Sequence, residues 1–190
     1  MMNMIKILLI LAINVSNYSM DYKKFENLLG KHISISKFFT GSDFKTNNYG
    51  KKFYINSEQI DDSFLGVPYN FITIIPDEND TIQSITIHFP KLINRQFYDS
   101  FIEKYGEPNN IQVIENRKVM SKGTYGDSDF KQHLTKSTFD LREGSFEENP
   151  LFIIWKKDSF QINFFFRYEQ NKSELTFSFL EELPLIKTKE

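Results

Sequence analysis

The sequence contains no cysteine among its 190 residues, and this absence excludes several classes of protein and site. A disulfide framework, a thiolate zinc site, an iron–sulfur cluster and a cysteine nucleophile all need thiols. A lipoprotein anchor is excluded for the same reason, because it needs a lipidated cysteine. Glycine is scarce as well, with eight residues scattered along the chain, and neither G-x-G-x-x-G nor G-x-x-x-x-G-K occurs. The chain therefore lacks a Gly-rich phosphate loop, and we expect no cofactor.

The chain also lacks an excess of charge of either sign. Lysine and arginine total 23 against 25 aspartate and glutamate, so the formal net charge is only -2. A nucleic-acid binder usually carries a strong basic excess, so we expect no nucleic-acid partner. Hydrophobic residues make up 40% of the chain and 20 residues are Phe, a composition too apolar for intrinsic disorder. The length suits one domain, or two small repeats that share a core.

The first 19 residues have the three-part layout of a secretory signal peptide. Lys6 is followed by an apolar run from Ile7 to Val15 and then by small polar residues. A transmembrane helix needs about 20 apolar residues, so this run is too short for a permanent span. We therefore expect cleavage after residue 19, a mature domain of residues 20–190 without a membrane span, and a periplasmic or secreted location. A retained anchor and a buried N-terminal element are the alternatives.

Hydrophobic spacing predicts two helices. Residues 21–31 read as a short helix that ends at Gly30, and apolar residues from Ile93 to Tyr105 recur at helical spacing before Gly106 and a proline. Residues 33–39 alternate like a strand.

Alternating residues predict two antiparallel hairpins. In the first, residues 66–76 and 81–89 flank a four-residue turn, which would place Ile72 opposite Ile85. In the second, residues 151–155 and 160–168 flank a turn at Lys157-Asp158, which would place Trp155 opposite Phe160. Each register gathers the large apolar side chains on one face.

Three further segments complete the sheet. A strand is expected in residues 111–120, and another follows the second hairpin in residues 174–180. Residues 121–149 are polar, with one strand candidate at Thr135–Leu141. A structureless loop of that length would be unusual, so an extended hairpin or a mobile flap is expected there.

These elements predict an α+β domain in which an antiparallel, twisted sheet carries one or two helices packed on one face. A helix followed by strands occurs twice, in residues 21–89 and 92–180, so an internal repeat is a further hypothesis. The helix ending EKYGEP (residues 103–108), followed by strands that contain IIWKK and a Phe-rich run, resembles small uncharacterised secreted proteins of Bacteroidetes-type bacteria. Two helix-plus-sheet units are also similar to the repeats of β-lactamase-inhibitor-protein-like folds. This resemblance implies a fold and carries over no functional residue.

The sequence offers little evidence of catalytic or metal-binding chemistry. Its three histidines, His32, His88 and His133, are far apart and form no helical zinc motif. Two acidic turns, at residues 77–80 and 127–129, lack the spacing of a calcium-binding loop. Aspartate and asparagine are also common turn formers, so we predict neither a metal site nor catalytic residues.

The strand at residues 160–168 carries the best binding candidate. Its large apolar residues alternate inward, which leaves Gln161, Asn163, Phe165 and Arg167 on the other face. Phe beside Arg is a composition typical of an interface centre. The sequence leaves two interpretations open: the helix that ends at Tyr105 covers this face, or the face is a surface that binds another protein.

From the sequence we expect an exported, non-enzymatic binding or interaction module. A small secreted hydrolase or sugar-processing domain is the first alternative, and it needs acids from residues 77–80 and 121–149 to meet in one cleft. An extracytoplasmic protein inhibitor that uses the face around Phe165 is the second alternative.

Overall fold

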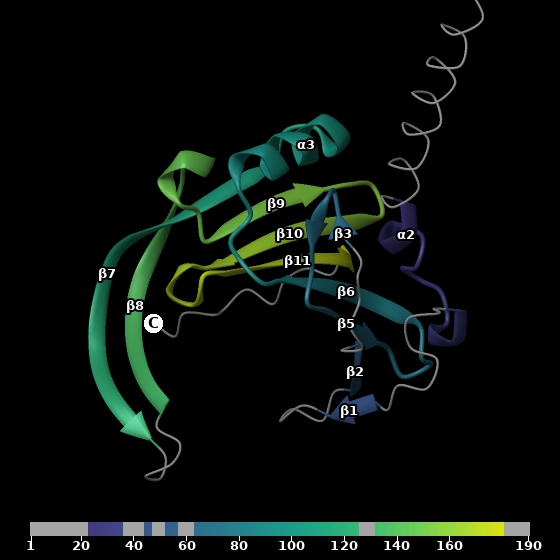
Figure 1. Ribbon diagram of the computed structural model, residues 1–190, viewed down its shortest axis with the longest axis horizontal. Helices are drawn as coiled ribbons and strands as arrows, with labels where there is room; N and C mark the ends of the chain where they lie inside the picture. Colours follow the sequence, from purple (N-terminus) through teal and green to yellow (C-terminus); the bar gives the residue numbers. More distant parts are fainter. Residues whose placement is uncertain (1–22, 36–43, 47–51, 57–62, 126–131, 181–190) are drawn as a thin grey trace, which may run out of the picture.

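The computed structural model describes residues 23–35, 44–46, 52–56, 63–125 and 132–180. They form an α+β structure, a nine-stranded antiparallel open sheet with one long helix, α3, on one face (Figure 1). Along the sheet the strands follow the order β1-β2-β5-β6-β11-β10-β9-β7-β8, and β3 and β4 form a separate small hairpin. The bounds are α2 Lys23–Glu26, β1 Phe44–Thr46, β2 Lys52–Asn56, β3 Ser63–Phe64, β4 Val67–Pro68, β5 Phe71–Pro76, β6 Ile82–Phe89, α3 Arg95–Tyr105, β7 Asn110–Tyr125, β8 Gln132–Glu143, β9 Phe152–Lys156, β10 Phe160–Arg167 and β11 Lys172–Phe179.

The predicted helix over residues 93–105 is confirmed as α3. The side chain of Asn94 caps it by accepting a hydrogen bond from the Phe97 N–H at 2.9 Å. At the other end Gly106 has a φ of 75°, a conformation that favours glycine. Phe97 and Phe101 on one side of α3 pack against the sheet through Phe164, whose ring centroid lies 4.9 Å from that of Phe101. The core therefore lies between α3 and this face of the sheet.

Both predicted hairpins form, but each has a register two residues away from the predicted one. Ile72 pairs with Ile87 instead of Ile85. The loop has five residues instead of four, because Pro76 pairs with Ile82, and an irregularity at Ile75/Pro76 shifts the register by one residue more. Thr81 lies outside this pairing and makes an isolated bridge to His32. A shift of two residues leaves every side chain on its predicted face, so the isoleucines are buried as expected.

The second hairpin shows the same kind of correction. Trp155 pairs with Ile162 instead of Phe160. The turn is closed by the Lys157 N–H, which donates to the Phe160 carbonyl, so Asp158 and Ser159 form its tip. Trp155, Ile162 and Phe164 are still all buried on the helix-covered face.

The N-terminal expectations are met only in part. The helix expected over residues 21–31 is the four-residue α2, followed by turns up to Gly30, which has a φ of 74°. The strand expected from residue 33 is wrong where the structure describes it, because Ile33–Ile35 forms a 3-10 helix. The signal peptide expected in residues 1–19 lies outside the described residues. Among the described helices, none is long and apolar enough to cross a membrane.

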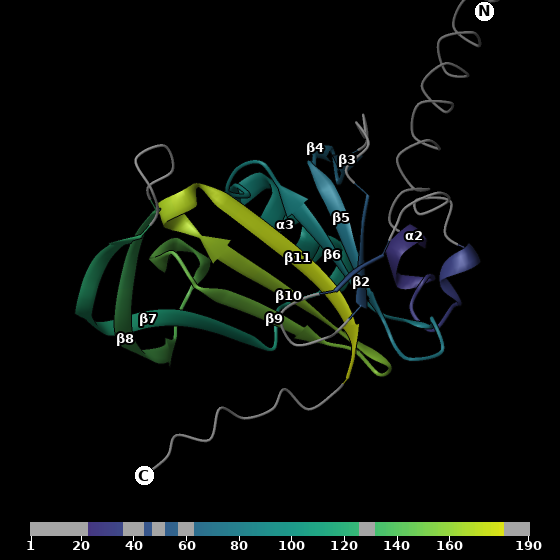
Figure 2. The same cartoon turned by 90° about the horizontal axis from the view of Figure 1, so that it is seen from below.

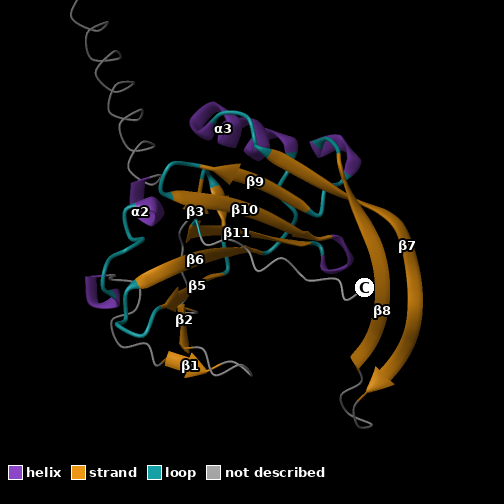
Figure 3. Cartoon of the chain, turned by 180° about the vertical axis from the view of Figure 1, so that it is seen from behind, coloured by secondary structure: helices purple, strands orange, loops and turns teal. Residues whose placement is uncertain are grey.

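Residues 121–125 and 132–143 belong to an extended hairpin of β7 with β8, which was one of the two expectations for residues 121–149. β7 pairs with β9 only over Asn110–Gln112, and beyond that point it pairs with β8 alone. We call this projecting part, residues 113–125 and 132–143, the arm. It curves away from β9 toward the side opposite α3 (Figures 1 and 3), and Figure 2 shows it at the opposite end of the sheet from α2.

Candidate functional site

The face of the sheet that carries Phe165 is not the face that α3 covers. The rings of Phe97 and Phe101 on α3 contact Phe164, and Phe164 and Phe165 point to opposite faces of β10 because side chains alternate along a strand. The interpretation in which the helix ending at Tyr105 covers Phe165 is therefore wrong. We call the face of β5, β6, β9, β10 and β11 opposite α3 the open face.

Strand registers align one row of side chains across the open face. Pairs link β5 to β6, β6 to β11, β11 to β10 and β10 to β9 in a continuous chain. The row is Phe71, His88, Glu174, Phe165 and Phe152. Residues that are far apart in the sequence thus become immediate neighbours, and we call them the central row.

One end of the central row is aromatic. The rings of Phe152 and Phe165 are stacked with centroids 5.0 Å apart and planes 18° from parallel. The guanidinium carbon of Arg167 lies 5.1 Å from the centroid of Phe165, within the range of a cation–π contact. Arg167 also donates through Nε to Glu174 Oε1 at 2.9 Å, so the cation is held between a ring and a carboxylate.

The other end of the central row is organised around His88. Its ring stacks on Phe71 with centroids 4.1 Å apart, and its Nε2 lies 3.0 Å from the hydroxyl of Thr73. Its Nδ1 lies 3.5 Å from Glu174 Oε1. The hydrogen bond with His88 and the charge of Arg167 lower the pKa of Glu174 from its ordinary value, against the opposing effect of burial.

A second row of polar side chains runs beside the central row. The hydroxyls of Thr86 and Thr176 are 2.9 Å apart, and Thr176 pairs in turn with Asn163. The Asn163 Oδ1 is buried and accepts no hydrogen bond from the described residues. Gln161, in the row after that, is only 6% exposed. Of the four predicted binding residues, Phe165 and Arg167 therefore lie in or beside the central row, and Asn163 and Gln161 lie in neighbouring rows of the same face.

Three functional candidates were missed or undervalued in the sequence. Phe152 and Glu174 were not singled out, and His88 was considered only as one of three histidines that form no zinc motif. The alternation of β6 does place His88 on this face. Its contact with Glu174 depends on the pairing of β6 with β11, strands that are some 90 residues apart, and no local pattern reports that pairing.

The acidic turn at residues 77–80 has a structural explanation. Asp77 Oδ1 accepts hydrogen bonds from the N–H groups of Asn79 and Thr81, both at 2.9 Å, and these bonds lower the pKa of Asp77. Three strands, β11, β10 and β9, separate this end of β6 from the arm. The described acids of residues 121–149 therefore do not meet the turn in a common site. Asp127, Asp129 and the side chain of His133 lie outside the described part.

Within the described ranges, no group of three or more His, Asp or Glu side chains could hold a metal ion.

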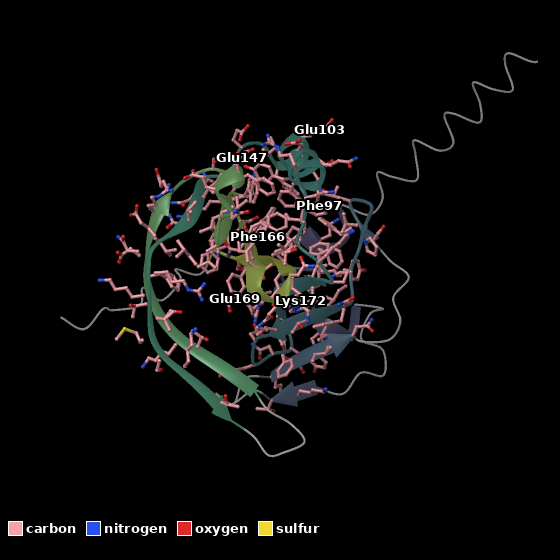
Figure 4. All side chains as sticks on the ribbon, turned by 60° about the vertical axis from the view of Figure 1, so that its left-hand side comes forward. Phe97, Glu103, Glu147, Phe166, Glu169 and Lys172 are labelled. Carbon is pink, nitrogen blue, oxygen red and sulfur yellow. The ribbon has the colours of Figure 1, made fainter. Side chains whose placement is uncertain are left out.

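The open face continues toward the arm. Gln112 pairs with Phe152, which extends the central row onto β7, and Ile114 pairs with Leu141 on the same side. Arg117 on the arm donates to Glu169 Oε1 at 2.7 Å, a contact that joins the arm to the turn between β10 and β11. Figure 4 shows Glu169 and Lys172 at this turn, away from Glu103 on α3.

Comparisons with family models, with curated proteins and with solved structures find no match to this chain. The resemblance to small secreted bacterial proteins therefore stays a prediction.

Proposed function

We propose that this chain is a non-enzymatic binding module that holds a protein partner on its open face, in the periplasm, in the envelope or outside the cell. The observation that carries the proposal is the group formed by Phe152, Phe165, Arg167 and Glu174. It combines an aromatic pair with an arginine on a face that α3 leaves uncovered. The signal peptide expected in residues 1–19 supports the location.

The composition of this group favours a protein partner. Interface centres are enriched in aromatic residues and arginine, which supply large contact areas and directional hydrogen bonds. The Arg167 guanidinium is already ordered by Phe165 and Glu174, so little conformational entropy is lost when a partner binds it. Its side chain remains 41% exposed, which leaves donor groups accessible.

A photo-reactive phenylalanine in place of Phe152 tests the proposal with little change of shape. In the native host, we expect it to form an adduct of one defined mass with a protein. The same amino acid in place of Glu103, on the exposed side of α3, should form no such adduct. The identity of the captured protein also distinguishes a structural partner from an enzyme target, which would identify the chain as an inhibitor.

A matched pair of arginine variants shows whether the adduct depends on the open face. Arg95 on α3 resembles Arg167, because it lies 5.6 Å from the ring of Tyr98 and 2.6 Å from the carboxylate of Asp99. Arg167→Ala should reduce the yield of the adduct at least about tenfold, as expected for a hot-spot residue, whereas Arg95→Ala should leave it unchanged. No adduct at position 152, or equal yields in both variants, would refute the proposal.

A further inference from the structure

The outer edge of the arm is a long, regular strand that pairs with no other strand of the described residues. β8 is the last strand of the sheet and has 12 residues without a proline. The two irregularities of the β7–β8 hairpin place the extra residues on β7, between Glu115 and Lys118 and between Val119 and Ser121. β8 itself therefore keeps an uninterrupted alternation. Such an edge exposes a row of backbone donors and acceptors that can pair with another strand.

We propose that a second copy of this chain pairs with β8, antiparallel and about a two-fold axis at Thr138. In this register Lys136 of each copy lies opposite Asp140 of the other, so one symmetric contact forms two pairs of opposite charge. Ser137 lies opposite Phe139, and Thr135 lies opposite Leu141. Side chains directly opposite in an antiparallel pair interact, and opposite charges there are stabilising.

Other registers place like charges together, lack an opposite-charge pair or align far fewer residues. The axis must pass through a residue, because only then do outward-pointing peptide groups of both edges face one another. An axis at Lys136 or at Asp140 would pair each of these residues with itself. An axis at Phe139 would place Lys136 opposite Arg142, and an axis at Ser137 forms no opposite-charge pair among the described side chains. An axis at Leu141 would place Asp140 opposite Arg142, but it would align only residues 139–143 of the two edges, against residues 133–143 with the axis at Thr138. The charge pattern and the length of the aligned strands together select Thr138.

Exposed apolar side chains on the arm support the same contact. Phe139 is 42% exposed and Leu141 is 44% exposed, although both are large and apolar. With the axis at Thr138, the two Phe139 rings become diagonal neighbours on one face of the joined sheet, within reach of each other. Lysine at a sheet edge normally discourages pairing, but here each Lys136 meets a carboxylate.

Charge reversal tests both the contact and its register. In sedimentation velocity across a wide range of protein concentration, the unmodified chain should reach the mass of a dimer. Lys136→Asp places two aspartates opposite two aspartates, and Asp140→Lys places lysine opposite lysine. Each variant should weaken dimerisation about tenfold or more, whereas Lys91→Asp, an exposed change outside the arm, should not.

Mixing the two weakened variants restores opposite charges. A Lys136→Asp chain and an Asp140→Lys chain pair Asp with Lys at both positions, so we expect a heterodimer of near-native affinity. The double variant should also dimerise with itself. An unmodified chain that stays monomeric, single variants that dimerise like the Lys91→Asp control, or a mixture that does not associate would overturn the proposal.

Discussion

The body of the molecule and the arm are built from the same kind of strand, but they are held together differently. In the body, α3 and five strands enclose a core that contains Phe101, Trp155 and Phe164. In the arm, beyond Val113, no described side chain is buried. The arm depends on the pairing of β7 with β8 and on surface contacts such as Arg117 with Glu169.

This difference separates the part of the molecule that supplies its stability from the part whose groups are exposed for binding. Burial of apolar surface is the main source of folding free energy, so the body should account for nearly all of the stability of this chain. The arm exposes large apolar residues, Phe139 and Leu141, and an edge strand, β8, that pairs with no further described strand. In the body, α3 covers the large apolar residues of one face of the sheet. A region that adds little to stability but exposes such features is well placed for contact with another molecule.

The largest effect should come from opening the core. Phe101 is fully buried, and its ring contacts those of Tyr105, Trp155 and Phe164. Phe101→Ala should lower the free energy of unfolding by about 3–5 kcal/mol, because it removes apolar contacts and leaves a cavity. Phe139→Ala, the same change on the arm, should alter it by only about 0.5 kcal/mol. Urea unfolding monitored by the fluorescence of Trp155 measures both values.

Equal losses in these two variants would show that the arm is part of the cooperative core, and the comparison of the two regions would fail.

A smaller effect is expected at the junction between body and arm. A Cβ on Gly144 would overlap the Cγ2 of Val113, which is buried at the base of the arm, and would lie 2.9 Å from Glu148 Oε2. Gly144→Ala should therefore cost about 1–3 kcal/mol of unfolding free energy, a range typical of overpacking. In the Val113→Ala background the added cost should shrink, because the overlapping methyl group is gone. An additive double variant in the same urea experiment would contradict this account.

The sequence predicts which face each residue occupies, but it does not predict which residue lies opposite it. Alternation placed Ile72, Ile85 and Phe164 in the core correctly, because the period of a strand is two residues. A slip of two residues keeps that pattern, so alternation could not detect that Ile72 pairs with Ile87. The correct register depends on local details, such as the bridge between Thr81 and His32.

The candidate site was predictable in part for the same reason. Phe165 and Arg167 were found because they are two apart on one strand. His88 and Glu174 come together only when β6 and β11 pair, and that order of strands is decided by the packing of the whole sheet. The helix was correctly predicted from Ile93 to Tyr105, but periodicity alone could not say which face of the sheet it covers.

A modest effect of pH is expected from the central row of the open face. The hydrogen bond with His88 lowers the pKa of Glu174 in the folded state below its ordinary value of 4.5. The unfolded state therefore binds this proton more readily, so the stabilisation is complete above about pH 4.5 and is lost as the pH falls through the folded-state pKa. Glu174→Gln should remove this part of the acid dependence, about 1 kcal/mol or less. Unfolding curves at pH 3 to 7 for both proteins measure it.

The exposed pair of Glu169 with Arg117 provides the control for that measurement, since the Glu169 side chain is 72% exposed and water screens its charge. Glu169→Gln should leave the acid dependence of the chain unchanged. If both variants flatten the curve to the same extent, the acid dependence does not come from the central row.

The smallest effect on stability should come from the most drastic change, the removal of most of the arm. Glu115 and Asp140 are directly opposite in the hairpin, so residues 116–139 can be replaced by Asn-Gly, which forms a tight hairpin turn. The free energy of unfolding should change by no more than about 1 kcal/mol, because none of the described side chains in the deleted part is buried. Self-association should disappear, because Lys136 and Thr138 are removed. A shortened chain that unfolds as easily as Phe101→Ala would show that the arm supports the body, whereas one that still dimerises would place the contact elsewhere.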